Sequence, residues 1–315
     1  MQKTVLFIDT VHPVLQEELQ KAGFTCTDAS KWDIDAVYAG IQSACGLVIR
    51  SRFLIDKTFL DRPHTLRFIA RAGSGMENID VAFAESRGIA CLNAPEANKD
   101  AVAEQAIGML IMLMNRLAIA DREVRKGSWK RGENRGWEIN GSTVSIIGFG
   151  NNGSAFAEKI SGFGVNILAY DPHITIDKAK YPAVRQAGMQ EIFTESDIIS
   201  FHVPLNAETR YMVNDEYLNS FSKNIWLINT ARGKILDTAA LVKALDTGKV
   251  RGAALDVLEY ESHSFEDLSA ADFPEPFRKL IESDKTVLSP HIAGWTHESH
   301  VKISKVLAQK IIRLF

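Results

Sequence analysis

The stretch "STVSIIGFGNNGSAFAEKI", Ser142 to Ile160, decides the fold class of this chain. It passes from an apolar run into three glycines, Gly148, Gly150 and Gly153, and then into an amphipathic pattern with helical periodicity. Glycines at this G-x-G-x-x-G spacing allow a tight turn and let backbone N–H groups approach a pyrophosphate at the start of a helix. The motif is weak evidence alone, but between a predicted strand and a predicted helix it indicates a dinucleotide-binding turn.

The strand predicted after this turn indicates which dinucleotide is bound. "VNILAYD" ends at Asp171, about 20 residues after Gly153, where dinucleotide-binding folds place an acidic residue. A carboxylate there accepts hydrogen bonds from the adenine ribose and repels a 2′-phosphate. No arginine follows before Arg185, so the pattern favours NAD over NADP.

Composition describes an ordinary globular chain. Its 315 residues, 46% of them hydrophobic, suffice for a large core and for two domains. With 36 basic and 39 acidic residues the net charge is -3, which favours neither nucleic acid nor an anionic membrane, so recognition by charge must be local. The cysteines Cys26, Cys45 and Cys91 form no C-x-x-C pair. We therefore expect reduced thiols in the cytoplasm and no metal site.

No segment of the chain has the composition and length expected of a targeting signal or a membrane-spanning helix. The start "MQKTVLFIDT" reaches Asp9 after too few apolar residues for a signal peptide and is predicted to be a strand. The apolar run from Ala106 to Met114 is far shorter than the roughly 20 residues that span a bilayer. It is predicted to be a buried or interface helix.

Short apolar runs alternate with amphipathic stretches along the whole chain, which is typical of β-α-β units and a mainly parallel sheet. One set of runs covers residues 1 to about 97, and a second begins near the helical pattern "KDAVAEQAIGMLIMLMNRL". The predicted strands are "TVLFID", "GLVIRS", "LRFIARAG", "TVSIIGFG", "NILAYDP", "DIISFHVP", "IWLINTARG", "RGAALDV" and "KTVLSPHIAG".

Reactive side chains follow three of the later predicted strands. Arg232 follows "IWLINT", and a guanidinium there can hold a carboxylate through two hydrogen bonds. His291 follows "TVLSP". Asp256 is near the end of "RGAALDV", and Glu259 and Glu261 follow that run. A histidine paired with a carboxylate is oriented for proton transfer, and the pattern alone leaves open which carboxylate it meets.

The order of these motifs resembles the D-isomer-specific 2-hydroxyacid dehydrogenases, from about Leu47 to Thr296. The motifs "IRSR" and "IARAGSGMENID" resemble most those of the 3-phosphoglycerate dehydrogenase branch. The resemblance implies two doubly wound parallel-sheet α/β domains, with a Rossmann NAD-binding domain, 98–294, inserted into a flavodoxin-like substrate (catalytic) domain, 1–97 and 295–315. That insertion explains why the glycine turn lies mid-chain, and it implies an active site in the cleft between the domains.

The resemblance also implies roles for single residues. Arg232 resembles the arginine that binds the carboxylate and polarises the carbonyl, and His291 resembles the acid/base. The catalytic glutamate of the family stands five residues after the aspartate of "L-D-V", which selects Glu261, and Asp256 would lie near the nicotinamide amide. The residues expected to contact NAD are those of the glycine turn and the facing strand ends, namely Gly148, Gly150, Asn151, Asn152, Gly153, Asp171, His202, Pro204, Thr230, Ala231, Arg232, Asp256 and His291.

Substrate contacts are implied at two motifs of the first domain. "AGSGMEN" resembles a loop whose backbone N–H groups at Gly73, Ser74 and Gly75 bind the substrate carboxylate, and Asn78 belongs to the same motif. Arg50 and Arg52 of "IRSR" resemble a pair that meets a phosphate. The alternative is that one or both arginines are salt-bridged surface residues.

Three positions depart from the family pattern. Glu77 stands where aspartate is usual, Ser262 replaces a proline after the catalytic glutamate, and Trp295 replaces a small residue after His291. The tryptophan could narrow the pocket. The chain ends at Phe315, near the end of the family's catalytic core, so feedback by serine through a further C-terminal domain is not expected.

The implied activity is NAD-dependent conversion of D-3-phosphoglycerate to 3-phosphohydroxypyruvate, in serine biosynthesis. A glyoxylate or hydroxypyruvate reductase is the nearest enzymatic alternative, and an NAD(H)-sensing protein of the corepressor type is the alternative from another class. The family usually forms homodimers through its nucleotide domain. The "AIGMLIMLMNRL" helix with Trp129 and Trp137 could provide that surface.

Overall fold

The computed structural model describes residues 3–261 and 273–315, so Ser262 lies outside the described residues. The chain divides into two compact units, Met1–Asn98 with Trp295–Phe315, and Lys99–Gly294. The boundary predicted after residue 97 lies one residue before this division.

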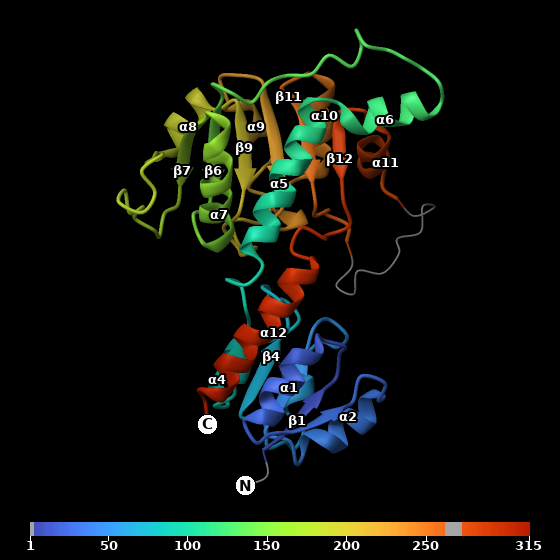
Figure 1. The fold of residues 1–315 in the computed structure, drawn as a ribbon, viewed down its shortest axis with the longest axis vertical. Helices are drawn as coiled ribbons and strands as arrows, with labels where there is room; N and C mark the ends of the chain where they lie inside the picture. The colour runs from blue at the N-terminus through green and yellow to red at the C-terminus, as the bar shows by residue number, and fades with distance from the viewer. Residues whose placement is uncertain (1–2, 262–272) are drawn as a thin grey trace. The chain divides into compact units, whose positions relative to one another are not determined.

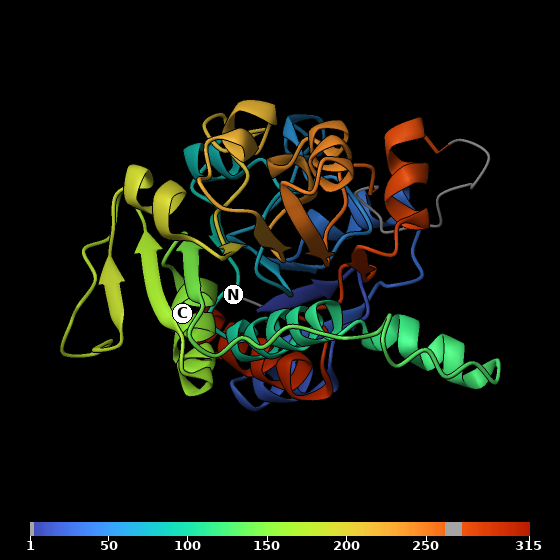
Figure 2. The same ribbon diagram turned by 90° about the horizontal axis from the view of Figure 1, so that it is seen from above.

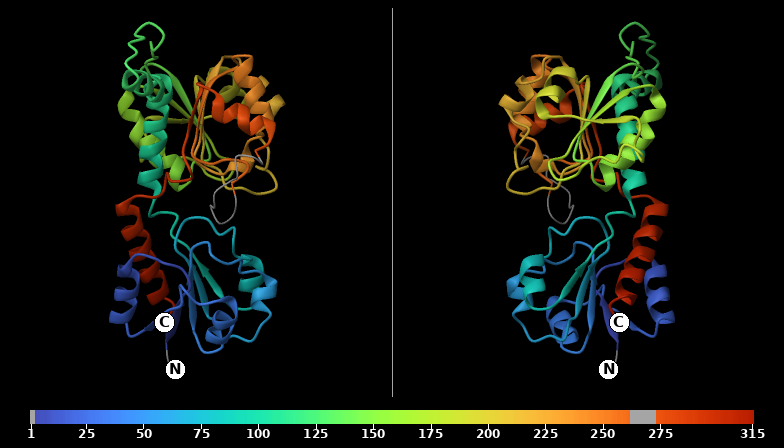
Figure 3. Two further views of the ribbon diagram at one scale, coloured as in Figure 1. Left: turned by 90° about the vertical axis from the view of Figure 1, so that its right-hand side faces the viewer. Right: turned by 90° about the vertical axis from the view of Figure 1, so that its left-hand side faces the viewer.

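The first unit contains a five-stranded parallel sheet in the order β2-β1-β3-β4-β5. This is the flavodoxin-like order, which reverses direction between β1 and β3. Helices α1 and α12 cover one face and α2 to α4 the other (Figure 3). The elements are β1 (Thr4–Phe7), α1 (Pro13–Lys21), β2 (Thr25–Asp28), α2 (Ile34–Ile41), β3 (Gly46–Ile49), α3 (Lys57–Leu60), β4 (Phe68–Arg71), α4 (Val81–Ser86), β5 (Ala90–Leu92) and α12 (His297–Ile312).

The second unit contains a seven-stranded parallel sheet in the order β12-β11-β10-β9-β6-β7-β8. This is the Rossmann order with one strand added, and the direction of winding reverses between β6 and β9, where dinucleotides bind. The elements are α5 (Lys99–Met114), α6 (Leu117–Arg125), β6 (Thr143–Ile147), α7 (Asn151–Ile160), η1 (Ser161–Phe163), β7 (Asn166–Tyr170), β8 (Val184–Gln186), α8 (Met189–Glu195), β9 (Ile198–Phe201), α9 (Asp215–Asn219), β10 (Ile225–Asn229), η2 (Gly233–Ile235), α10 (Thr238–Asp246), β11 (Val250–Leu255), α11 (Glu275–Glu282) and β12 (Thr286–Leu288).

Both faces of the larger sheet are covered, which is why its strands are nearly continuous apolar runs. Helices α5 and α7 pack on one face through Leu110 and Phe156, and α8 to α11 pack on the other (Figures 1 and 2). Every residue of β6, β9 and β10 is buried. The α/β fold predicted from the alternation of apolar runs is confirmed.

The sequence did not predict three strands, β2, β5 and β8, which lie at or next to sheet edges. Each has only three or four residues and none is fully buried; β2 and β8 carry no apolar run, and the apolar run of β5 is only three residues long. The predicted helix around Ala106–Met114 is part of α5 and packs against the larger sheet. Among the described residues no single helix could span a membrane; α5 and α6 meet that test only as a pair bent by 62°.

Candidate active site

The glycine turn joins β6 to α7 with a geometry that only glycine satisfies at two positions. Gly148 has φ +89°, and a Cβ there would lie 2.9 Å from the carbonyl of His202. A Cβ on Gly153 would lie 2.0 Å from the carbonyl oxygen of Gly148. At Gly150, immediately before α7, no described atom lies within 4 Å of an added Cβ. The turn therefore leaves open space at the N-terminus of α7, as a bound pyrophosphate requires.

The open space at Gly150 gives a direct test of this assignment. Gly150→Ala is expected to raise the Kd for NADH by about 10-fold or more, because the methyl group enters the space that the pyrophosphate needs. The melting temperature should stay unchanged, since the methyl group meets no protein atom. Calorimetric titration with NADH measures the first quantity and thermal denaturation the second.

A matched control is Gly162→Ala in η1, which also meets no atom within 4 Å but lies away from the turn. It should leave NADH affinity unchanged. Equal affinity in both variants would contradict the assignment of the turn.

Asp171 ties the glycine turn to the end of β7. One carboxylate oxygen accepts the N–H of Phe149 at 2.8 Å, and the other accepts those of His173 and Ile174 at 2.8 and 3.1 Å. Arg185, the next arginine in the sequence, pairs with Glu191 and Glu195. Its charge is thus balanced within the protein, in accord with the prediction of NAD rather than NADP.

Two further predicted NAD contacts carry polar atoms that the described residues leave without a partner. These atoms are Asn152 Oδ1, in the first turn of α7, and Thr230 Oγ1, directly after β10. Both are buried, and neither forms a hydrogen bond with another described residue. Buried polar atoms are normally satisfied, so these two are suited to a bound dinucleotide. Asn151 and Pro204 are exposed, whereas Ala231 is buried.

His202 forms contacts within the second unit. Its Nε2 lies 2.8 Å from Ser200 Oγ, and its ring packs against Phe156 of α7, with centroids 5.2 Å apart. Burial lowers the pKa of His202 to about 3, so the imidazole stays neutral. Its Nδ1 is buried and has no hydrogen-bond partner among the described residues, so the predicted contact with the cofactor stays a prediction.

Sheet topology brings the predicted catalytic residues to one edge. Strands β10, β11 and β12 are neighbours and parallel, so the segments that follow them emerge at the same edge. Arg232 follows β10, Glu261 follows β11, and His291 follows β12. This is the edge where doubly wound sheets bind their ligands.

His291 and Glu261 form a pair. Nδ1 of His291 lies 3.1 Å from Glu261 Oε2, and each side chain is about one quarter exposed, at 25% and 24%. Glu259, the alternative partner, accepts hydrogen bonds from Tyr211 Oη and the Thr238 N–H instead. Because Glu261 engages Nδ1, proton exchange with a substrate is assigned to Nε2.

The backbone of His291 adopts a left-handed conformation, with φ +55°. Its N–H donates to the carbonyls of Asp256 and Ser289, at 2.7 and 3.0 Å. A histidine at positive φ carries a strain of about 1–3 kcal/mol that the surroundings must offset, and such strain is typical of functional sites.

The Asp256 carboxylate provides part of that support. It is 1% exposed and accepts hydrogen bonds from Gln105 Nε2 (2.9 Å), Ser289 Oγ (2.6 Å) and the N–H groups of Ile292 (2.9 Å) and Ala293 (2.8 Å). The two backbone bonds hold the chain directly after His291. The Asp256 carboxylate therefore supports the backbone after His291, and its predicted place near the nicotinamide amide stays a prediction.

The sequence analysis missed Gln105 and Ser289, which complete this network. Gln105 is a polar residue within the otherwise apolar part of α5, and Ser289 directly follows β12. A polar side chain in a helix that packs on a sheet was the available signal, because such a group must find a buried partner.

In the first unit, two of the three predicted carboxylate-binding amides are available. The Gly73 N–H donates to the Arg71 carbonyl at 2.8 Å. Within residues 3–261 and 273–315, the N–H groups of Ser74 and Gly75 donate to no acceptor. These two amides can form a small anion-binding nest.

Of the other predicted substrate contacts, Asn78 and Arg52 form hydrogen bonds within the protein, whereas most of the Arg50 guanidinium has no acceptor among the described residues. Asn78 donates its amide to the carbonyls of Arg50 and Phe53, at 3.2 and 3.3 Å. Arg52 donates to the carbonyls of Ile8, Ala29 and Trp32, which favours a structural role for it. The Arg50 guanidinium has one such bond, 3.4 Å to Thr10 O, and is the better candidate for a substrate contact. Within the described chain neither arginine forms an ion pair, contrary to the salt-bridge alternative.

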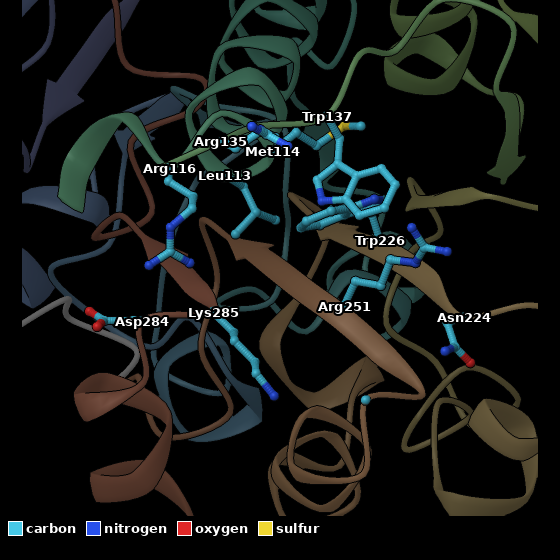
Figure 4. A pocket seen from close by; sticks show the side chains of 11 residues that line it. Leu113, Met114, Arg116, Arg135, Trp137, Asn224, Trp226, Arg251, Asp284 and Lys285 are labelled. Carbon is cyan, nitrogen blue, oxygen red and sulfur yellow. The ribbon is translucent and has the colours of Figure 1, made fainter. Parts of the chain in front are cut away.

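A cavity of about 370 Å³ lies at the opposite edge of the larger sheet (Figure 4). Asn224, Arg251 and Lys285, which line it, stand at or just before the first residues of β10, β11 and β12. Arg251 stacks on Trp137, 4.8 Å from the ring centroid. Because the cavity lies at the amino ends of the strands, it is separate from the catalytic edge.

Comparisons with known proteins agree with this geometry. The sequence pattern described as "D-isomer specific 2-hydroxyacid dehydrogenase, NAD binding domain" matches residues 107–293. A hydroxypyruvate reductase from Thermotoga maritima is 36% identical over 267 residues, 85% of this chain and 83% of that protein. A D-3-phosphoglycerate dehydrogenase from Archaeoglobus fulgidus is 34% identical over 268 residues, 85% of this chain but 49% of that protein.

The fold also matches solved structures along nearly its whole length. A D-lactate dehydrogenase from Aquifex aeolicus, solved with NAD and lactic acid, aligns with a TM-score of 0.82 and 26% identity, over 98% of this chain and 94% of that one.

The chain spans about half the length of the D-3-phosphoglycerate dehydrogenases that it matches.

Proposed function

The chain belongs to the family of D-isomer-specific 2-hydroxyacid dehydrogenases with NAD as cofactor, and from that premise we propose that it oxidises a small D-2-hydroxy acid at C2 and, in reverse, reduces the corresponding 2-keto acid. The observation that carries the proposal is the His291–Glu261 pair, 3.1 Å apart, at the same sheet edge as Arg232. Bound NAD supplies the acceptor for the hydride that leaves C2.

Each residue of the site has a defined task in this proposal. His291 Nε2 takes the proton of the substrate hydroxyl, and Glu261 stabilises the imidazolium that forms. Arg232 holds the substrate carboxylate and polarises the oxygen at C2. In the first unit, the Ser74 and Gly75 amides are the proposed donors to an anionic group of the substrate. In the reductive direction His291 returns the proton.

We propose D-3-phosphoglycerate as the substrate, with 3-phosphohydroxypyruvate as the product, a reaction that leads to serine. The Arg50 side chain and the 34% identity to the Archaeoglobus enzyme support this choice. A hydroxypyruvate or glyoxylate reductase is the second candidate, because the Thermotoga hydroxypyruvate reductase is 36% identical over most of its own length.

Absorbance of NADH separates the two candidates. Purified protein should oxidise D-3-phosphoglycerate with NAD and reduce 3-phosphohydroxypyruvate with NADH, while hydroxypyruvate and glyoxylate react slowly. Preference for the unphosphorylated keto acids would transfer the assignment to the reductase branch. Absence of turnover on all four, with NADH still bound, would refute the enzymatic proposal.

We further propose a homodimer formed through the second unit. Helix α6 has no buried residue and extends away from its sheet (Figure 2), and Trp129 and Trp137 are 77% and 56% exposed. Exposed aromatic side chains on an extended segment are typical of association surfaces. The three free cysteines agree with the proposed cytoplasmic location.

Sedimentation velocity tests the homodimer. The wild-type protein should sediment at twice the 34.9 kDa of one chain, and Trp129→Ser with Trp137→Ser should sediment as single chains. Ile281→Ser, which changes an exposed apolar residue on α11, is the control and should remain dimeric. A single-chain mass for the wild type would contradict this proposal.

A further inference from the structure

The Arg50 guanidinium lies over an indole ring in the first unit. Its Cζ is 4.3 Å from the ring centroid of Trp295, a residue that is 50% exposed. Stacking of this kind uses the face of the guanidinium and leaves its N–H groups in the plane, directed outward. One of them reaches Thr10 O at 3.4 Å, a long hydrogen bond. Most of the donor edge of Arg50 therefore has no acceptor among the described residues.

The loop that carries Arg50 is held by a carboxylate that does not pair with the guanidinium. Asp9 Oδ2 accepts the backbone N–H groups of Arg50, Ser51 and Arg52, at 2.7, 3.0 and 3.1 Å. Burial lowers the pKa of Arg50 from its usual value, and Asp9 partly offsets that effect. A partly desolvated guanidinium that contacts no carboxylate is suited to an incoming anion.

Trp295 also contacts His300, which in turn contacts His12. Its ring centroid is 4.9 Å from that of His300 in α12, and the His300 ring meets His12 edge-on at 5.7 Å. His12 Nδ1 accepts the Val14 N–H at the start of α1. Burial, and then the nearby Arg50 and His12, lower the pKa of His300 from its usual value. Neither the indole nor the two imidazoles carry a negative charge, so this group of rings brings none to Arg50.

We propose that Trp295 is a positioning residue, which holds the Arg50 guanidinium with its donor edge directed at a phosphate ester on the substrate. The inference rests on the proposed function and deepens it, because it names the structural basis of selectivity for a phosphorylated substrate. A phosphate ester offers three oxygens and close to two negative charges, which match the planar N–H fork of arginine. Trp295 is also one of the three positions at which the resemblance indicated a departure from the family pattern.

Reduction of 3-phosphohydroxypyruvate and of hydroxypyruvate with NADH tests this role. Trp295→Leu removes the stack but keeps an apolar side chain, and it should raise the KM for the phosphorylated substrate about 5-fold with kcat unchanged. The KM for hydroxypyruvate should stay within about twofold, since that substrate makes no such contact. Trp295→Phe keeps an aromatic face and should restore most of the selectivity.

Coupling to Arg50 distinguishes positioning from general packing. Arg50→Ala should raise the KM for the phosphorylated substrate about 100-fold, as loss of charge-assisted hydrogen bonds implies. Adding Trp295→Leu to Arg50→Ala should cause no further loss, because Trp295 then has nothing to position. Equal effects of Trp295→Leu on both substrates, or fully additive losses, would overturn the inference.

The neighbouring arginine offers a matched control. Phe53 stacks on Arg52 at 4.6 Å, but the Arg52 guanidinium is occupied by three backbone carbonyls. Phe53→Leu should therefore leave the ratio of the two KM values unchanged.

Direct binding keeps this inference separate from the proposed activity. Calorimetric titration of D-3-phosphoglycerate into the NADH-bound protein should show weaker affinity in Trp295→Leu and in Arg50→Ala than in the wild type. If the wild type turns over no substrate, the proposed function fails, while this titration still decides the role of Trp295. Unchanged affinity in both variants would refute it.

Discussion

Replacing His291 by asparagine is expected to lower turnover by about 10² to 10⁴, the usual contribution of a positioned acid/base. The imidazole Nε2 is the group assigned to the proton of the substrate hydroxyl, and an amide cannot take that proton at neutral pH. Asparagine is the suitable replacement because it tolerates the φ of +55° better than most residues. Steady-state kinetics with the substrate found in the NADH assay measures the loss.

Two comparisons make the His291 result specific. The Kd for NADH should change less than about twofold, since the glycine turn that binds the pyrophosphate is untouched. His297→Asn changes an exposed histidine at the start of α12 and should keep wild-type turnover. Near-normal turnover of the His291 variant would remove it from the mechanism.

Replacing Asp256 by alanine is expected to lower the free energy of unfolding by about 3–5 kcal/mol, because buried donors left without an acceptor cost about 1–3 kcal/mol each. Four donors lose their acceptor, and two of them are the backbone N–H groups that follow His291. Denaturant unfolding followed by circular dichroism measures the change. Turnover should fall as well, because the strained backbone of His291 loses its support.

The control for this variant is Asp246→Ala, which removes an exposed carboxylate at the end of α10. It should change the free energy of unfolding by no more than about 0.5 kcal/mol. An Asp256→Ala protein as stable as this control would show that the buried network does not hold the loop.

The sequence predicted the glycine turn well because its signals are local. A tight turn at positive φ, a helix that starts directly after it and a close approach to His202 all require glycine at fixed spacing. The strands β6, β9 and β10 were predicted for a similar reason, since strands buried on both faces are continuous apolar runs. The strands β2 and β8 were missed because their partly exposed segments carry no such run, and β5 was missed because its run is only three residues long.

The roles of individual polar side chains were less predictable. From the sequence, Arg50 and Arg52 were equally good candidates for a phosphate contact. In the structure, Arg52 donates to three backbone carbonyls. Arg50 lies over Trp295, which is 245 positions away in the chain. Asp256 lies at the predicted strand end, yet its partner Gln105 comes from α5. Such assignments depend on which distant segments meet, and that information is absent from any single stretch.

The amino-acid sequence by itself determined the α/β class, the position of the dinucleotide turn and the candidate residues at strand ends, because each depends on the periodicity and backbone freedom of neighbouring residues. The family resemblance had selected Glu261 over Glu259 as the partner of His291, and the structure places the two side chains together. Only the tertiary structure showed that the Asp256 carboxylate binds the backbone after His291 and that Trp295 lies against Arg50. The physical reason is that a hydrogen bond or a ring stack forms over about 3–5 Å in space. Sheet order and helix packing set such distances between segments that are far apart in the chain.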